Sequence, residues 1–271
     1  MLQYSRAAQR LIEMHHSARV GHLGGNISCL SALVAIVNKI EEGDRLVLSK
    51  GHSAGALYVA MCQIGLLSDS DLSTFHRDGT SLPGHPPANA HEFIPFATGS
   101  LGHGLSLACG LALSRTLRHQ SGKVYCLTSD GEWQEGSTWE ALIFACKQGL
   151  GKRLRILVDH NGYQGFGSTA EVAGMDPLWE RLIGFPIDPV IVDGHDLVAI
   201  SAALERIPSK VIFENSNQPS SPFKNAALCS LHPLTSTLVV ALLLGILINE
   251  LRSVMLLVVL NGLIPAPPLS V

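Results

Sequence analysis

Short apolar runs alternate with segments of helical spacing along the middle of the chain. Four of these runs have the length and composition of buried strands: 123–128 (KVYCLT), 155–159 (RILVD), 189–193 (PVIVD) and 210–214 (KVIFE). Between them, the spacing predicts helices over residues 137–148 and 196–206. Strand, helix and strand in this order indicate parallel strands joined by crossovers. We therefore predict a doubly wound α/β domain, a parallel sheet flanked by helices, over residues 1–215.

The first part of the chain has apolar positions at intervals of three and four residues. This pattern predicts helices over 2–16, 28–40, 53–64 and 103–119. A capping signature opens a shorter helix at Ser68-Asp69-Ser70-Asp71. A loop rich in glycine, proline and histidine is expected over residues 78–95.

Residues 215–222 (NSNQPSSP) have the composition of a domain joint, so we treat residues 216–271 as a divergent tail. Residues 236–262 of this tail faintly resemble the truncated opening of a second domain, and an unrelated tail is the alternative. Its longest apolar run, 238–248, is followed by Glu250 and Arg252. Because a membrane span needs about 18 consecutive apolar residues, we expect a buried helix and a strand here, not an anchor.

Composition narrows the class of protein. The chain is 46% hydrophobic and 15% charged, with a net charge of −3, so a large core is expected and a partner is expected to cover part of the surface. The absence of any long basic run argues against nucleic acid. The N-terminus lacks the apolar core of a signal peptide, and the six cysteines form no CxxC pair, so we expect reduced thiols in a cytoplasmic protein.

Two polar residues follow the ends of runs that we predict to be neighbouring strands. Asp130 comes after the first run and Asn161 after the second. Ligands of open parallel sheets bind beyond the carboxyl ends of the strands, so both side chains should lie at one rim. Gly131 would let the backbone approach a bulky anion. Carboxylate and amide oxygens suit Mg²⁺ or Ca²⁺, and a cation at this rim could hold a diphosphate.

These residues belong to a longer pattern. Ser129-Asp130-Gly131, a spacer of 29 residues and Asn161 resemble the thiamine-diphosphate signature. Four further motifs resemble those of the transketolase family, in order: Gly21-His22-Leu23-Gly24-Gly25, Leu48-Ser49-Lys50-Gly51-His52, Pro83-Gly84-His85-Pro86, and Thr98-Gly99-Ser100-Leu101-Gly102-His103-Gly104. The segment 129–141 (SDGEWQEGSTWEA) is most similar to members of the family made of separate subunits.

The resemblance implies roles for the matched residues. The metal ion would be held by Asp130, Asn161 and the carbonyl of Tyr163. Thiamine diphosphate would be contacted by His52, Gly102, His103, Asp130, Gly131 and Asn161. The catalytic residues would be His22, His52 and His85, which handle protons and hydroxyls of the sugar, and Glu135, which would meet the catalytic glutamate of a partner.

The implied activity is transfer of a two-carbon ketol unit between sugar phosphates. The implied assembly is a homo- or hetero-oligomer in which a pyrimidine-domain subunit completes the active site, so the chain alone would be inactive. After Phe213 the family's Gly/Lys-rich stretch and a further histidine are missing, which keeps an inactive, cofactor- or partner-binding relative as an alternative.

Two enzymatic alternatives fit less well. The motif Ser49-Lys50-Gly51-His52 argues against a 1-deoxyxylulose-5-phosphate synthase-like enzyme. A Rossmann dehydrogenase would need GxGxxG after its first strand, and the chain has none there.

Overall fold

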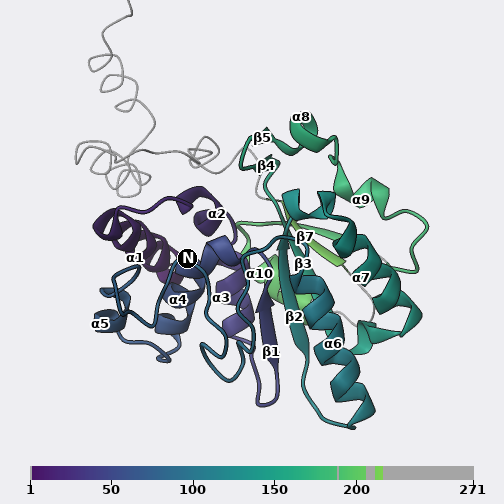
Figure 1. Cartoon of the computed structure of the whole chain (residues 1–271), viewed down its shortest axis with the longest axis horizontal. Coiled ribbons are helices and arrows are strands. Elements are labelled where there is room, and N and C mark those ends of the chain that lie inside the picture. Colours follow the sequence, from purple (N-terminus) through teal and green to yellow (C-terminus); the bar gives the residue numbers. More distant parts are fainter. Residues whose placement is uncertain (1, 188, 206–210, 216–271) are drawn as a thin grey trace, which may run out of the picture. The chain divides into compact units, whose positions relative to one another are not determined.

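The structure is a computed structural model that describes residues 2–187, 189–205 and 211–215, all of them within the unit that spans residues 1–231 (Figure 1). The strands are β1 (Arg45–Leu48), β2 (Val124–Ser129), β3 (Leu154–His160), β4 (Tyr163–Gln164), β5 (Gly167–Ser168), β6 (Val190–Asp193) and β7 (Val211–Asn215). The α-helices are α1 (Leu2–Ala18), α2 (Leu23–Ser28), α3 (Leu30–Val37), α4 (Ala54–Gln63), α5 (Asp69–Leu72), α6 (Gly104–Leu117), α7 (Gly136–Lys147), α8 (Thr169–Ala173), α9 (Leu178–Arg181) and α10 (Leu197–Glu205).

Five strands form one parallel sheet in the order β1-β2-β3-β7-β6. The register places Leu48 opposite Leu127 and Ser129 opposite Asp159, so the carboxyl ends of β1, β2 and β3 lie at the same edge. A separate antiparallel hairpin, β4-β5, follows β3 directly. The sheet therefore brings three loops that are far apart in the sequence to one rim.

Helices cover both faces of the sheet (Figure 1). On one face α6 contacts β1, β2, β3 and α7, and buried Leu105, Leu142 and Val158 join one apolar cluster there. On the other face α3 contacts α1, α4 and α10, and its residues 30–37 are all buried. Burial of apolar side chains on both faces is what a doubly wound sheet requires. The predicted fold class is confirmed.

Two sequence predictions about the elements are incomplete. Strand β1 was not predicted, because only three of its residues are apolar and its first is Arg45. The helix predicted over 28–40 is present as α3 but is shorter, and the short helix α2 before it was not predicted. The two helices are separated at Cys29, which has φ −98° and ψ 6° and whose N–H bonds to the Ile27 carbonyl.

The predicted capping box of α5 is present: the Ser68 side chain accepts from the Asp71 N–H, and the Asp71 carboxylate accepts from the Ser68 N–H. The five cysteines in the described part of the chain are free. No helix among the described residues is long and apolar enough to cross a membrane. The predictions for residues 216–271 lie outside the described residues.

Candidate functional site

The candidate site lies where three neighbouring parallel strands end. β1 leads to Lys50-Gly51-His52, β2 leads to Asp130-Gly131, and β3 leads to Asn161. The Asp130 N–H bonds to the Asp159 carbonyl at 3.0 Å, which fixes the end of β2 against the end of β3. The structure thus brings together residues that the sequence separates by about a hundred positions.

Asp130 is the buried carboxylate at the centre of this rim, with 2% of its surface exposed. Its carboxylate accepts from the Gly131 N–H at 2.8 Å and from the Gly162 N–H at 2.7 Å. Burial, followed by the negative charge of Asp159, raises the pKa of Asp130 to about 7, although the two N–H groups lower it. A nearby cation would favour the charged form of such a carboxylate.

Asn161 opens the tight turn that faces Asp130. Its Oδ1 accepts from the Tyr163 N–H at 2.8 Å. Gly162, the middle residue of the turn, donates its N–H to the Asp130 carboxylate. Tyr163 is 44% exposed and starts β4. Of the three oxygens expected to bind the metal ion, one therefore belongs to the Asp130 carboxylate. The other two belong to the turn 161–163, which is hydrogen-bonded to that carboxylate.

The electrostatics of this region fit a divalent cation. Three buried carboxylates, on Asp130, Glu132 and Asp159, occur with one buried ammonium, on Lys50. If all four ionise, the formal charge is −2. Burial also raises the pKa of Glu132 to about 7, against hydrogen bonds from Ser49 and Ser129 that lower it. Oxygen donors and excess negative charge are the properties that Mg²⁺ or Ca²⁺ requires.

The three histidines expected to act on the sugar form one cluster. The ring centroids of His22 and His52 lie 5.6 Å apart, and those of His22 and His85 lie 6.1 Å apart. His22 has φ 64°, in the left-handed region that costs a non-glycine residue about 1–2 kcal/mol. A glycine packs closely against each of the other two histidines. A Cβ on Gly25 would lie 3.2 Å from the His52 ring, and a Cβ on Gly99 would lie 2.9 Å from the His85 ring.

Burial, followed by the positive charge of Lys50, lowers the pKa of His52 to about 3. The folded chain thus holds His52 neutral, whereas the unfolded chain protonates it below about pH 6.5. His52 therefore removes stability as the pH falls below about 6.5 and has no such effect above it. The pKa of His85 is also lowered by burial.

We expect His52→Gln to weaken this acid sensitivity. In the ligand-free chain the variant should gain about 1 kcal/mol over the wild type for each pH unit between 6.5 and 5. Urea unfolding at pH 7.5, 6.0 and 5.0 measures the difference, with His16→Gln, a change at an exposed position of α1, as the control. Parallel pH profiles for the wild type and His52→Gln would contradict this explanation.

The remaining predicted residues lie at the start of α6 and α7. Gly102 has φ 82°, and a Cβ on it would come within 2.6 Å of the Glu135 Cβ, so a larger residue would displace this loop. The Ser137 hydroxyl donates to the Gly102 carbonyl at 3.0 Å. Glu135 is exposed immediately before α7, and His103 is exposed immediately before α6. The predicted contact of Glu135 with a partner stays a prediction.

The roles of the buried polar residues behind the rim were not predicted from the sequence. Glu132 is fully buried and accepts hydrogen bonds from the Ser49 hydroxyl and the Ser129 N–H. Lys50 and Asp159 are fully buried and form an ion pair. For Asp159 the sequence did carry a signal, since this charged residue ends a continuous apolar run. A charged residue that is buried with such a run almost always has a partner of opposite charge or a hydrogen-bond partner. For Lys50 that signal was hidden, since β1 itself was not predicted.

Comparison with known proteins agrees with this geometry. Residues 35–211 match the family model described as transketolase, thiamine diphosphate binding domain. The chain belongs to the transketolase family. It is similar to the 6-deoxy-6-sulfo-D-fructose transketolase subunit of Clostridium sp. (strain MSTE9), with 35% identity over 78% of this chain and 82% of that relative. It is also 34% identical to one subunit of the apulose-4-phosphate transketolase of Phocaeicola vulgatus, over 72% of this chain and 73% of the relative.

The fold of this transketolase-family chain matches solved transketolases. The transketolase of Pichia stipitis in complex with sedoheptulose-7-phosphate superposes with a TM-score of 0.71 and 26% identity. The match covers 79% of this chain and 35% of that one. The chain therefore spans about a third of the length of this solved enzyme, the part that corresponds to the thiamine-diphosphate-binding domain.

Proposed function

We propose that the chain is the diphosphate-binding subunit of a transketolase that transfers a two-carbon ketol unit between sugar phosphates. In this proposal residues 1–215 form the thiamine-diphosphate domain, and a pyrimidine-domain subunit supplies the other half of the active site. The supporting observation is that His52, Asp130 and Asn161 follow three adjacent strand ends of one sheet, with the His22 ring beside the His52 ring. Two relatives named as transketolase subunits support the division into subunits.

The donor set fits a cation that holds a diphosphate. The Asp130 carboxylate, the Asn161 amide oxygen and the Tyr163 carbonyl would bind Mg²⁺ or Ca²⁺. Gly131, Gly102 and His103 would line the path of the diphosphate. When bound, thiamine diphosphate supplies an electron sink for cleavage of the ketose beside its carbonyl.

The histidines would act on the sugar. His52, neutral because burial lowers its pKa to about 3, would donate or accept a hydrogen bond without adding charge. His22 and His85 would move protons to and from the sugar hydroxyls. Glu135, exposed immediately before α7, would meet the catalytic glutamate of the partner at the subunit contact.

In this proposal the site is half of an active centre, which gives a direct test. The purified chain with thiamine diphosphate and Mg²⁺ should transfer no ketol unit from a ketose phosphate to an aldose phosphate. Addition of a pyrimidine-domain subunit should produce turnover, because the partner would contribute the catalytic glutamate of the active site.

Coupled detection of the aldose product measures this turnover, and the partner by itself is the control. Robust transfer by the chain alone would show that the half-site proposal is wrong. No transfer by the mixture, with both subunits folded and associated, would favour an inactive cofactor-binding relative.

A further inference from the structure

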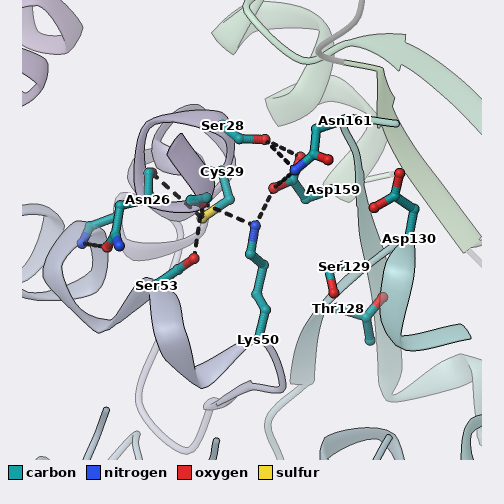
Figure 2. A network of polar contacts seen from close by, with 12 residues as sticks. Asn26, Ser28, Cys29, Lys50, Ser53, Thr128, Ser129, Asp130, Asp159 and Asn161 are labelled. Atoms are coloured by element: carbon teal, nitrogen blue, oxygen red, sulfur yellow. Dashed lines mark hydrogen bonds and ion pairs between the residues drawn. The ribbon is translucent and has the colours of Figure 1, made fainter. Parts of the chain in front are cut away.

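A buried polar network lies directly behind the candidate metal site (Figure 2). Its centre is the ion pair of Lys50 Nζ with Asp159 Oδ2, two side chains with no exposed surface. The Ser28 hydroxyl donates to Asp159 Oδ1 at 2.5 Å. Lys50 Nζ also donates to the Gly25 carbonyl at 3.0 Å. The network therefore joins α2, the loop after β1 and the end of β3.

Each of these three segments carries a residue of the candidate site. His22 precedes α2, His52 lies two residues after Lys50, and Asn161 lies two residues after Asp159. Two buried charges are costly unless each has its partner, so the ion pair constrains the segments that hold it. The network is thus placed to set the relative positions of the histidine cluster and the metal rim.

The contact with Asn161 is more specific. Asn161 Nδ2 donates to Ser28 Oγ at 3.2 Å and approaches Asp159 Oδ2 at 3.4 Å, while its Oδ1 accepts from the Tyr163 N–H. Reversal of this amide would place its oxygen against a carboxylate and its NH₂ group against an N–H donor. The hydrogen bonds therefore allow one orientation of the amide, the one in which its oxygen is on the side of Tyr163.

We propose that Ser28 and the Lys50–Asp159 ion pair are positioning residues that hold the nitrogen of the Asn161 amide and so direct its oxygen to the cation. A cation binds the oxygen of an amide and not its NH₂ group, so an unrestrained amide would bind it less well. This inference rests on the proposed cofactor site at Asp130 and Asn161. It assigns a role to three residues that do not themselves contact the metal ion.

The first test is Ser28→Ala in the full chain, measured by the Mg²⁺ concentration needed for half-maximal binding of thiamine diphosphate in calorimetry. The requirement should rise by about 10–100-fold, as is typical when the support of a metal ligand is lost. The matched control is Ser53→Ala. The buried Ser53 hydroxyl donates at 2.9 Å to the Gly25 carbonyl, to which Lys50 also donates, but it has no bond to Asn161. It should change the requirement by less than about 3-fold, below that 10–100-fold range.

The second variant removes both buried charges together, as Asp159→Leu with Lys50→Met, which leaves no unpaired charge in the core. If the ion pair is only structural, the melting temperature of this variant and its Mg²⁺ requirement should change together. If it positions Asn161, the Mg²⁺ requirement should rise at least 10-fold even in a variant that melts like the wild type.

The outcomes separate this inference from the proposed function. Metal-dependent binding by the wild type with an unchanged Mg²⁺ requirement in Ser28→Ala overturns the positioning role alone. A folded double variant with the wild-type requirement does the same. Wild-type protein that binds thiamine diphosphate equally with and without Mg²⁺ overturns both proposals. If the double variant does not fold, Ser28→Ala and Ser53→Ala decide the matter.

Discussion

Replacement of Asp130 by alanine should abolish metal-dependent binding of thiamine diphosphate. Asp130 is the only acidic side chain among the three proposed metal ligands, so its loss should weaken binding by more than the ~10–100-fold typical of residues that merely support a ligand. The same change leaves the N–H groups of Gly131 and Gly162 without the acceptor they have now. Calorimetric titration of thiamine diphosphate at saturating Mg²⁺ measures the affinity.

Asp71→Ala is the matched control for Asp130→Ala. The Asp71 carboxylate also accepts a backbone N–H, that of Ser68, but it caps the remote helix α5. Loss of this cap should lower the stability of the chain without a change in cofactor affinity. Unchanged binding in Asp130→Ala, or equal loss in the two variants, would exclude the proposed metal site.

The second large effect is expected from Gly51→Ala. A Cβ at this position would lie 2.6 Å from the Thr98 carbonyl carbon and 2.7 Å from the Gly99 nitrogen, both backbone atoms that cannot rotate away. The loop after β1 would be forced from the loop before α6, and His52 would move with it. We expect a loss of about 1–3 kcal/mol of stability, as in other overpacked sites. Turnover with the partner should fall about 100-fold, the effect of a ~1 Å misplacement.

Gly110→Ala provides the contrast for Gly51→Ala. A Cβ on Gly110, in the middle of α6, would meet no atom within 4 Å. Alanine should therefore stabilise this helix by about 0.5–1 kcal/mol and leave cofactor binding and turnover as they are. Thermal unfolding, cofactor titration and turnover of both variants check the pair. Normal stability and turnover in Gly51→Ala would show that the two loops do not need their close approach.

The sequence predicted the sheet well where the strands are long enough to show their pattern. β2 and β3 are continuous buried runs, and the spacing of helices around them was sufficient for the fold class. β1 was missed because its four residues show no period. Helix α2 was missed because it has only six residues and two of them are glycines, which are poor helix formers.

The candidate site was predicted at its rim but not behind it. Asp130 and Asn161 could be placed together because parallel strands end at one edge. The motifs brought His22, His52 and His85 into the prediction, and the structure places their rings side by side. The partners of the buried charges are set by packing across three segments. No local pattern pairs Lys50 with Asp159, 109 residues away.

The central claim is a metal-dependent cofactor site on this chain, and one titration tests it most directly. Thiamine diphosphate is titrated into the wild-type chain by calorimetry, once with saturating Mg²⁺ and once with EDTA. The account predicts saturable binding of one cofactor per chain with Mg²⁺ and none detectable with EDTA. Equal binding in the two conditions, or no binding in either, would contradict it.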